Sequence, residues 1–533
     1  MATTTPTSAP SPTKDPSPPS TTKSKVTRAA TISIFGLAML NIVAVLSLRG
    51  LPAVAEYGMG AIFYYVLAAV LFLVPTALVA AELATGWPET GGVFRWVGEA
   101  FGRRLAVVAM FMLVLEVTIW FPTALTFGAV AIAYTGPDHA ADAALAGNPL
   151  FVLAVVLVAY WLATFIALKG AKAFSRVAKW GGVIGTLIPA AILIVLGFAY
   201  VIAGNKPQID VSWKAIIPDF SNFGNIVLAA SIFLFYAGME MNAIHVKDVK
   251  NPTKSYPIAM LIAVVGTVIV FVLGALAVAF IVPNKDINLV QSLLTAYNDL
   301  FAWAHIVWAG PVIAVALAIG VFAGLVTWIS GPSSGLLVVA KAGNLPPFFQ
   351  KTNQNGMGRN IMITQAIIVT VLAVLFIILP SVQSVYQILS QLTVILYLVM
   401  YLLMFAAVIR LQYTQPNRPR PYRIPGGKVG VWVVGGVGFV GSVVAMFFSF
   451  IPPNQIKVGS PVFYVGLLVV LTVFFVAVPF VVYRVRRDSW RDPKSDFAPF
   501  TWEVENIDAG TVSTSSKVPN QLHDMSTKAK SHA

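Results

Sequence analysis

Apolar segments long enough to cross a lipid bilayer recur along the whole chain and restrict what it can fold into. About 20 apolar residues in a helix span the roughly 30 Å of a hydrocarbon core. Hydrophobic residues make up 58% of the 533 residues and charged residues 11%, whereas a soluble domain carries about 25% charged residues. We therefore expect an all-α integral membrane protein with twelve transmembrane helices, at roughly 29–57, 60–84, 104–134, 149–168, 177–203, 225–249, 256–283, 307–340, 361–380, 384–410, 429–451 and 460–484.

The basic residues fall mainly on one side of this predicted membrane. Nearly all of the 35 Lys and Arg residues lie in the two tails and the even-numbered loops, and the exceptions are Lys206, Lys214, Lys285, Lys457 and, within a helix, Arg49. Basic loops face the cytoplasm, so we predict a multi-pass protein of the plasma (inner) membrane with both termini cytoplasmic. This distribution explains the net charge of +14 without nucleic acid, and membrane lipid is the expected surrounding.

Three charged residues lie deep within predicted helices. They are Arg49 in "SLRGLP", Glu116 in "LVLEVTIW" and Glu240 in "YAGMEMNA". A charge at mid-bilayer costs a few kcal/mol and marks a candidate functional site. Two interpretations stay open: Arg49 pairs with Glu116 or Glu240 to hold helices together, with Glu116 the expected partner, or these groups face a substrate. Glu240 is the first candidate for proton coupling, and Glu116 is a second candidate for that role or for an ion pair.

Two of the apolar segments are interrupted at matching positions. "SLRGLP" (47–52) breaks the first predicted helix, and "YAGME" (236–240) breaks the sixth. Matched interruptions indicate a transporter built from inverted repeats, and glycines such as Gly50 and Gly238 permit unwound backbone. The N-termini of half-helices attract carboxylates and their C-termini attract amines. An amino acid carries both groups and is the small-molecule ligand we expect.

Several motifs resemble the amino acid/polyamine/organocation transporter superfamily. They are "ELATGWPETGGVFRWVGEAFG" (82–102) and "GMEMNAIHVKDVKNPTKSYPIAM" (238–260). Within that superfamily "WISGPSSGLLVVAKAGNLPPFFQKTNQNG" and "YRIPGGK" are most similar to the bacterial glutamate/GABA antiporter family. The resemblance covers roughly residues 30–485. It implies a five-plus-five inverted repeat with broken helices 1 and 6, plus two peripheral helices.

The resemblance divides the chain into five parts and implies a function. The predicted parts are a disordered cytoplasmic N-tail (1–28), a first repeat of helices 1–5 (29–203), a second repeat of helices 6–10 (204–411), helices 11–12 (412–487) and a cytoplasmic C-tail (488–533), for which disorder is the default expectation. The implied function is a secondary active antiporter, which exchanges an external amino acid for an internal product by alternating access.

The substrate site implied by the family lies at the two helix breaks. Carried over position by position, the family's helix 6 lining falls on Leu234 and Glu240, its helix 8 aromatic gate on Trp328 and its helix 10 tyrosine on Tyr397. Ordinary packing remains an alternative for each. With the breaks included, the candidate substrate-binding residues are Arg49, Gly50, Leu234, Tyr236, Gly238, Glu240, Trp328 and Tyr397. The chain departs from the family pattern at Arg49, at Glu116 and at Gly324, where the family has a glutamate.

Other functions are weighed against transport. The chain has no cysteine and five histidines, mostly in loops and tails, so we expect no metal site, no cofactor and no enzyme activity. A channel would more often show rings of pore-lining charge. A proton-coupled uptake carrier for neutral or cationic amino acids or polyamines remains the main alternative, and a non-transporting sensor is another. The sequence does not indicate the oligomeric state or which amino acid is carried.

Overall fold

A computed structural model of the chain describes residues 33–170, 180–218, 227–241, 249, 252–379, 381–454, 460–495 and 497–508. All regular secondary structure in these residues is helical, which confirms the expected all-α class. Within these described residues, ten helices are long and apolar enough to cross a membrane. They are formed by α3 (Gly60–Ala68) continuing through η2 (Ala69–Leu73) into α4 (Val74–Gly86), α6 (Arg103–Ala133), α8 (Pro149–Leu168), η3 (Val183–Leu187) with α10 (Ile188–Ile202), α12 (Pro252–Ile281), α14 (Ala309–Val339), α15 (Arg359–Ala373) with α16 (Leu375–Ile378), α17 (Val382–Thr414), α18 (Gly427–Ser449) and α19 (Pro461–Arg484).

The other two predicted membrane segments are not long straight helices. In the first, α1 (Ile34–Val45) and the stretch Leu48–Ala55 meet at an angle of 43°. In the second, the described part holds only η6 (Val227–Ala230) and α11 (Ser231–Tyr236), and residues 242–248 of that segment lie outside the described residues. The structure therefore shows ten long apolar helices and one bent pair, and twelve spans remain a prediction.

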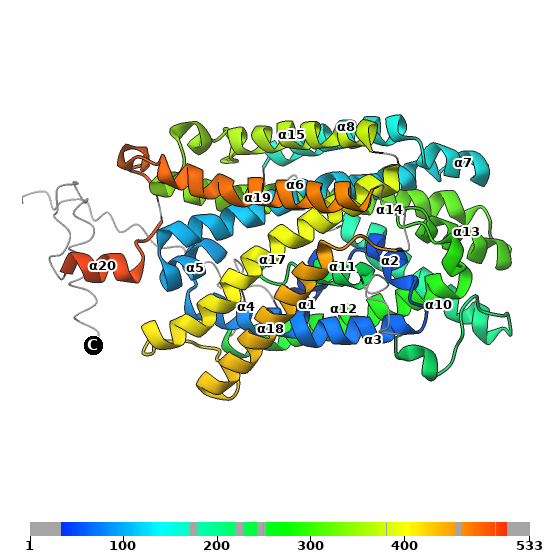
Figure 1. Cartoon of the computed structure of the whole chain (residues 1–533), viewed down its shortest axis with the longest axis horizontal. Helices are drawn as coiled ribbons and strands as arrows, with labels where there is room; N and C mark the ends of the chain where they lie inside the picture. Colours follow the sequence, from blue (N-terminus) through cyan, green and yellow to red (C-terminus); the bar gives the residue numbers. More distant parts are fainter. Residues whose placement is uncertain are drawn as a thin grey trace, which may run out of the picture.

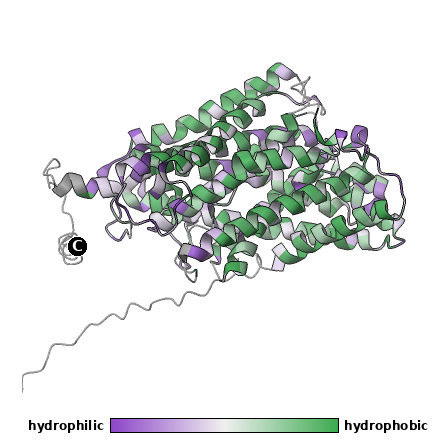
Figure 2. Ribbon diagram, turned by 90° about the horizontal axis from the view of Figure 1, so that it is seen from below, coloured by the Kyte–Doolittle hydropathy of each residue, from purple (hydrophilic) through white to green (hydrophobic). Residues whose placement is uncertain are grey.

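Polar residues gather at the two ends of the helix bundle. The long helices run roughly along the longest axis of the molecule, with α5 (Val93–Phe101) and α20 (Thr501–Asp508) at one end, and α7 (His139–Ala146) and α13 (Ser292–Trp303) at the other (Figure 1). Hydrophobic residues cover the length between these ends (Figure 2). Exposed apolar side chains such as Val470 and Phe474 on α19 suit contact with lipid.

Two helices form the centre of the bundle. In α6, 83% of the membrane-spanning stretch is buried, and in α17 the share is 72%, against 17% in α19. The helices α6 and α17 pack on each other, and α14 packs on α6. The sixth segment packs on α17 through α11, whereas the first packs mainly on α12 and reaches this centre through hydrogen bonds from Arg49 to Thr123 on α6 and Tyr386 on α17. The breaks therefore face the most buried part of the protein, away from lipid.

Small residues allow two helices to meet at backbone distance. A Cβ atom on Gly185 in η3 would lie 2.2 Å from the Cα atom of Gly320 in α14, and a Cβ on Gly181 would lie 2.1 Å from the Cβ of Ala323. Real Cβ atoms do not approach so closely, so this seam requires glycine at 181 and 185. Small residues at helix interfaces are the usual means of close packing in membranes.

The predicted cytoplasmic end of the bundle is closed by buried polar contacts. The side chain of Glu82, in the last turns of α4, is buried. Its carboxylate pairs with Arg420 at 3.3 Å and accepts hydrogen bonds from Gln412 Nε2 (2.7 Å) and the backbone N–H of Ile424 (2.8 Å). These contacts fasten the segment between α17 and α18 to α4, and they compensate the cost of burying the charge.

The expectation of a disordered C-tail is wrong for its first part. Contacts between the tail and the bundle run from Trp490 to Glu503, and Phe500 is fully buried. Arg95 Nη1 donates to the carbonyl oxygens of Ala498 (2.7 Å) and Pro499 (3.0 Å), and Arg103 pairs with Glu503 at 2.5 Å. The physical reason is the aromatic cluster in "FAPFTW", which buries apolar surface that a polar tail lacks. Residues 509–533 and 1–28 lie outside the described residues.

Candidate functional site

Helix 1 is interrupted where the sequence predicts it. Helix α1 ends at Val45, Leu46 and Ser47 are extended, and the chain resumes through η1 (Leu48–Gly50) and α2 (Leu51–Ala55). Pro52 lies in the first turn of α2, where its missing N–H is not needed by the helix. Because the stretch Leu48–Gly50 is buried, its backbone lies within protein and not against lipid.

Helix α11 ends at a second interruption. Tyr236 is its last residue, Ala237 is extended (φ −74°, ψ 150°), and Gly238 has a φ of +115°. Residues with a side chain rarely adopt that φ value, so a glycine is required to turn the chain here. The backbone N–H of Gly238, freed from the helix, donates to the hydroxyl of Tyr401 at 2.9 Å.

A small cavity lies between the two interruptions. Its volume is about 40 Å³, a few times the roughly 10–15 Å³ that a single water molecule needs. An amino acid is larger than a few water molecules, so the wall must move before one can enter. The cavity is lined by Ala44, Val45, Ser47, Arg49, Glu116, Val117, Trp120, Leu234, Phe235, Ala237, Trp328 and Tyr397.

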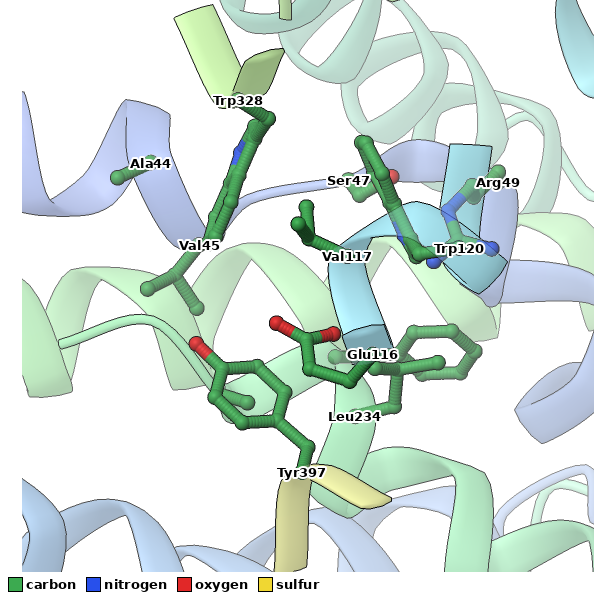
Figure 3. Close-up of a pocket in the computed structure, with 12 residues that line it drawn as sticks. Ala44, Val45, Ser47, Arg49, Glu116, Val117, Trp120, Leu234, Trp328 and Tyr397 are labelled. Atoms are coloured by element: carbon green, nitrogen blue, oxygen red, sulfur yellow. The ribbon is translucent and has the colours of Figure 1, made fainter. Parts of the chain in front are cut away.

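The structure brings five of the sequence-predicted residues to this cavity. Arg49 comes from the break of helix 1, Glu116 from α6, Leu234 from α11, Trp328 from α14 and Tyr397 from α17. Figure 3 shows them arranged around a common space. Residues up to 348 positions apart in the chain therefore share one wall of side chains.

The other four predicted residues lie beside the cavity. Gly50 is covered by the ring of Phe235, which lies 2.6 Å from where a Cβ would be. A Cβ on Gly238 would lie 3.4 Å from the Trp328 ring. Tyr236 donates its hydroxyl to the backbone carbonyl of Tyr65 at 3.2 Å, away from the cavity lining. These residues shape the backbone and packing around the space, and the fourth, Glu240, is described below.

Arg49 is buried, and its guanidinium donates hydrogen bonds to hydroxyl groups and not to a carboxylate. Its Nη1 donates to Thr123 Oγ1 and to the Tyr386 hydroxyl, both at 3.3 Å, and its Nε has no partner. The guanidinium carbon lies 5.2 Å from the centre of the Trp120 ring, on the side away from Trp328 in Figure 3. The expected pairing with Glu116 is wrong: within the described ranges, Arg49 forms no ion pair. The guanidinium turns instead toward Thr123 and Tyr386.

Glu116 is a buried carboxylate with a free oxygen. Its side chain is 2% exposed, and Oε1 has no hydrogen-bond partner in the structure. In Figure 3 the carboxylate points toward the side of the cavity where Tyr397 and Trp328 lie. A buried carboxylate without a full set of partners is costly, so this group has the capacity to accept a donor from a ligand.

Glu240 is enclosed by two tyrosines. Tyr397 donates to its Oε1 at 2.6 Å and Tyr401 to its Oε2 at 2.5 Å. Glu240 itself is absent from the cavity lining, whereas Tyr397 belongs to it. A ligand in the cavity therefore meets Glu240 through the hydroxyl of Tyr397.

Sequence reasoning missed four residues that complete the site. Trp120 and Thr123 follow Glu116 on α6 by four and seven residues, a spacing that places all three on one helix face. Tyr401 follows Tyr397 on α17 by the same four-residue step. Helical spacing from the predicted residues could have found these three. Tyr386 lies three turns before Tyr397, and its contact with Arg49 needs the tertiary structure.

The chemistry available here is recognition by charge, with a cation and an anion at one apolar space. Among the described residues no group of three or more His, Asp or Glu side chains is placed to hold a metal ion. The remaining lining is aromatic and aliphatic, which suits a small organic ligand whose orientation is fixed by few polar groups.

Comparison with known proteins decides the family. The family model described as "Amino acid permease" matches residues 31–475, most of the chain and both interruptions. The chain belongs to the amino acid permease family. This membership confirms the resemblance drawn from the sequence motifs, and the protein is a multi-pass membrane transporter of that family.

Individual relatives within the amino acid permease family cover almost the same span. An uncharacterized transporter of Legionella pneumophila is 38% identical over 450 residues, 84% of this chain and 95% of the relative. A glutamate/gamma-aminobutyrate antiporter of Lactococcus lactis is 33% identical over 459 residues, which cover 85% of this chain and 90% of the length of that antiporter. A probable agmatine/putrescine antiporter of the same species is 21% identical over 423 residues, 79% of this chain and 88% of its own.

Proposed function

We propose that this permease is a secondary active amino acid antiporter of the glutamate/GABA type, working by alternating access. The observation that carries the proposal is that Arg49 and Glu116, which form no ion pair with each other, line one cavity between two helix interruptions. An amino acid has one group to match each charge. The similarity to the Lactococcus glutamate/gamma-aminobutyrate antiporters supports the exchange mode.

The proposed membrane arrangement is twelve helices with both termini in the cytoplasm of a plasma membrane. The two repeats would be 29–203 and 204–411, followed by helices 11–12 within 412–487. Basic side chains support this orientation, because Arg95, Arg103, Arg418 and Arg420 all lie at the end of the bundle that carries α5 and α20.

The proposed cycle requires the cavity to open. Trp120 and Trp328 lie with ring centres 5.9 Å apart across the space, and an amino acid fits only when these rings separate. Binding and release on opposite sides would then follow from moving one group of helices against the other around a fixed site. Glu240 is the proposed proton-coupling group, since its carboxylate reaches the cavity through Tyr397.

Counterflow in proteoliposomes tests the function. Vesicles loaded with glutamate or GABA should take up labelled external glutamate or GABA far faster than empty vesicles, because an exchanger needs internal substrate. Equal uptake into empty vesicles under a proton gradient would establish the proton-coupled carrier instead. Binding without uptake in either case would establish a sensor.

A further inference from the structure

We propose that the cavity takes its ligand in one orientation, with a carboxylate on Arg49 and an ammonium on Glu116, and that Thr123 and Tyr386 are positioning residues for the guanidinium. The inference rests on the proposed amino acid transport and names the chemical class that the site selects. It predicts which half of the ligand each charge recognises.

Among the described residues, no carboxylate forms an ion pair with Arg49. The guanidinium is buried, and the two groups that it reaches are neutral hydroxyls at 3.3 Å. Charge-assisted N–H to carboxylate bonds are shorter, about 2.7–2.9 Å, so these contacts hold the group without compensating its charge. The Nε donor has no partner. A ligand carboxylate supplies the missing counter-charge and accepts two parallel bonds from the planar guanidinium.

Of the two buried glutamates near the cavity, Glu116 has an oxygen free to accept the ligand's ammonium group. Both oxygens of Glu240 already accept hydroxyl groups, from Tyr397 and Tyr401. Glu116 presents Oε1 without a partner and lines the cavity. Because Glu116 and Arg49 form no ion pair with each other, neither group occupies the other's hydrogen-bonding atoms before the ligand arrives.

Thr123 and Tyr386 hold the guanidinium at the cavity. Thr123 donates its own proton to the carbonyl of Trp120 at 2.7 Å, which leaves its oxygen lone pairs for Arg49. The Tyr386 hydroxyl accepts from Nη1 and lies 3.4 Å from the backbone carbonyl of Arg49, to which it donates. The break of helix 1 is thereby fastened to both α6 and α17. A ligand carboxylate that accepts the Arg49 N–H groups in place of Thr123 and Tyr386 changes the contact between helix 1, α6 and α17.

This arrangement discriminates between ligands of similar size. A diamine has no group for Arg49 and leaves a buried cation uncompensated. A ligand with a carboxylate but no amine leaves Glu116 unmatched. Only a ligand with both groups satisfies both charges, so the site selects amino acids over polyamines and over simple carboxylic acids.

The test measures binding of three matched probes to the purified full-length protein by titration calorimetry. The probes are GABA, its amide 4-aminobutanamide, which has no carboxylate, and butanoate, which has no amine. Arg49→Gln should lower the affinity for GABA by about ten- to hundredfold, which corresponds to the loss of a hydrogen bond to a charged group. The affinity for the amide should stay within about twofold of that of the wild type. Glu116→Gln should weaken GABA binding and leave butanoate unchanged or tighter.

The positioning residues have their own matched controls. Thr123→Val removes the hydroxyl and should raise the KM for GABA in counterflow with little change in maximal rate, while Thr123→Ser should restore the native KM. Tyr386→Phe should raise KM in the same way. Tyr160→Phe is its control, because the Tyr160 hydroxyl is buried without a partner and its loss should leave KM unchanged. A merely structural role would lower folded protein or maximal rate instead.

The outcomes separate this inference from the proposed function. If Arg49→Gln weakens GABA and the amide equally, or if Thr123→Val and Tyr386→Phe leave KM unchanged, the inference is overturned while amino acid exchange stands. If the wild-type protein neither binds GABA nor exchanges it for glutamate, the proposed function falls and the inference falls with it. If Arg49→Gln does not fold, the Thr123 and Tyr386 variants still decide the question.

Discussion

Replacing Phe500 with alanine should release the C-terminal segment from the bundle. The ring is fully buried, stacks on Trp502 with centroids 5.6 Å apart, and lies beneath the guanidinium groups of Arg95 (5.3 Å) and Arg103 (5.9 Å). Phe→Ala substitutions at buried sites cost about 3–5 kcal/mol. At about 1.4 kcal/mol for each tenfold change, the undocked population should rise by roughly two to three and a half orders of magnitude.

Limited trypsin digestion followed by mass spectrometry measures this change. Lys494 is an exposed cleavage site at the start of the docked stretch, and cleavage there tracks the population of the open form when closing is fast. Val504→Ala is the control, because Val504 lies in the same segment but is 37% exposed. It should leave the cleavage rate close to that of the wild type.

A substitution on the receiving surface tests the same contact from the other side. A Cβ on Gly98 would lie 2.2 Å from the Phe500 ring, so Gly98→Ala should also speed cleavage although it favours the helix. If neither Phe500→Ala nor Gly98→Ala raises the cleavage rate at least tenfold, the segment is not held by this aromatic contact and the reasoning is refuted.

Three further predictions concern the site and its surroundings. Gly50→Ala should destabilise the protein by about 1–3 kcal/mol through overpacking against the ring 2.6 Å away, seen as a lower Tm, whereas Gly466→Ala, with open space around it, should not. Trp328→Ala should lower the exchange rate more than the amount of folded protein, and normal exchange would show that the ring is only packing. Glu240→Gln should flatten the pH dependence of exchange; an unchanged profile would exclude it as the coupling group.

The helices and helix breaks that the lipid surroundings require were predictable from the sequence. The apolar segments had to be helices because lipid offers no partner for backbone groups, and ten of them are seen as long helices. The interruptions at Gly50 and Gly238 were predictable for the same reason, since an unwound backbone at that depth needs residues that tolerate it. The position of each helix break therefore follows from local sequence.

Partnerships between side chains were not predictable. Charge alone favoured Glu116 as the partner of Arg49, but the structure gives Arg49 two hydroxyls, one from α6 and one from α17. Tyr386 lies 337 residues from Arg49 in the chain, and no local pattern marks it. The composition of the C-tail also led to a wrong expectation of disorder, because its polar average does not reflect Phe500 and its aromatic neighbours. Such contacts depend on how helices are placed against one another.

The glycine seam between η3 and α14 limits how this transporter can move. With the Cα atom of Gly320 only 2.2 Å from where a Cβ on Gly185 would be, the two backbones have no side-chain layer between them that could yield. Tilting η3 against α14 would open a void that no nearby side chain can fill, so the two elements should move together as a rigid unit. Any step that exposes the cavity must then shear along other contacts, those between α14 and α6 among them, where Trp328 meets Trp120. The aromatic wall of the cavity thus lies on one of the contacts that must rearrange when the cavity opens.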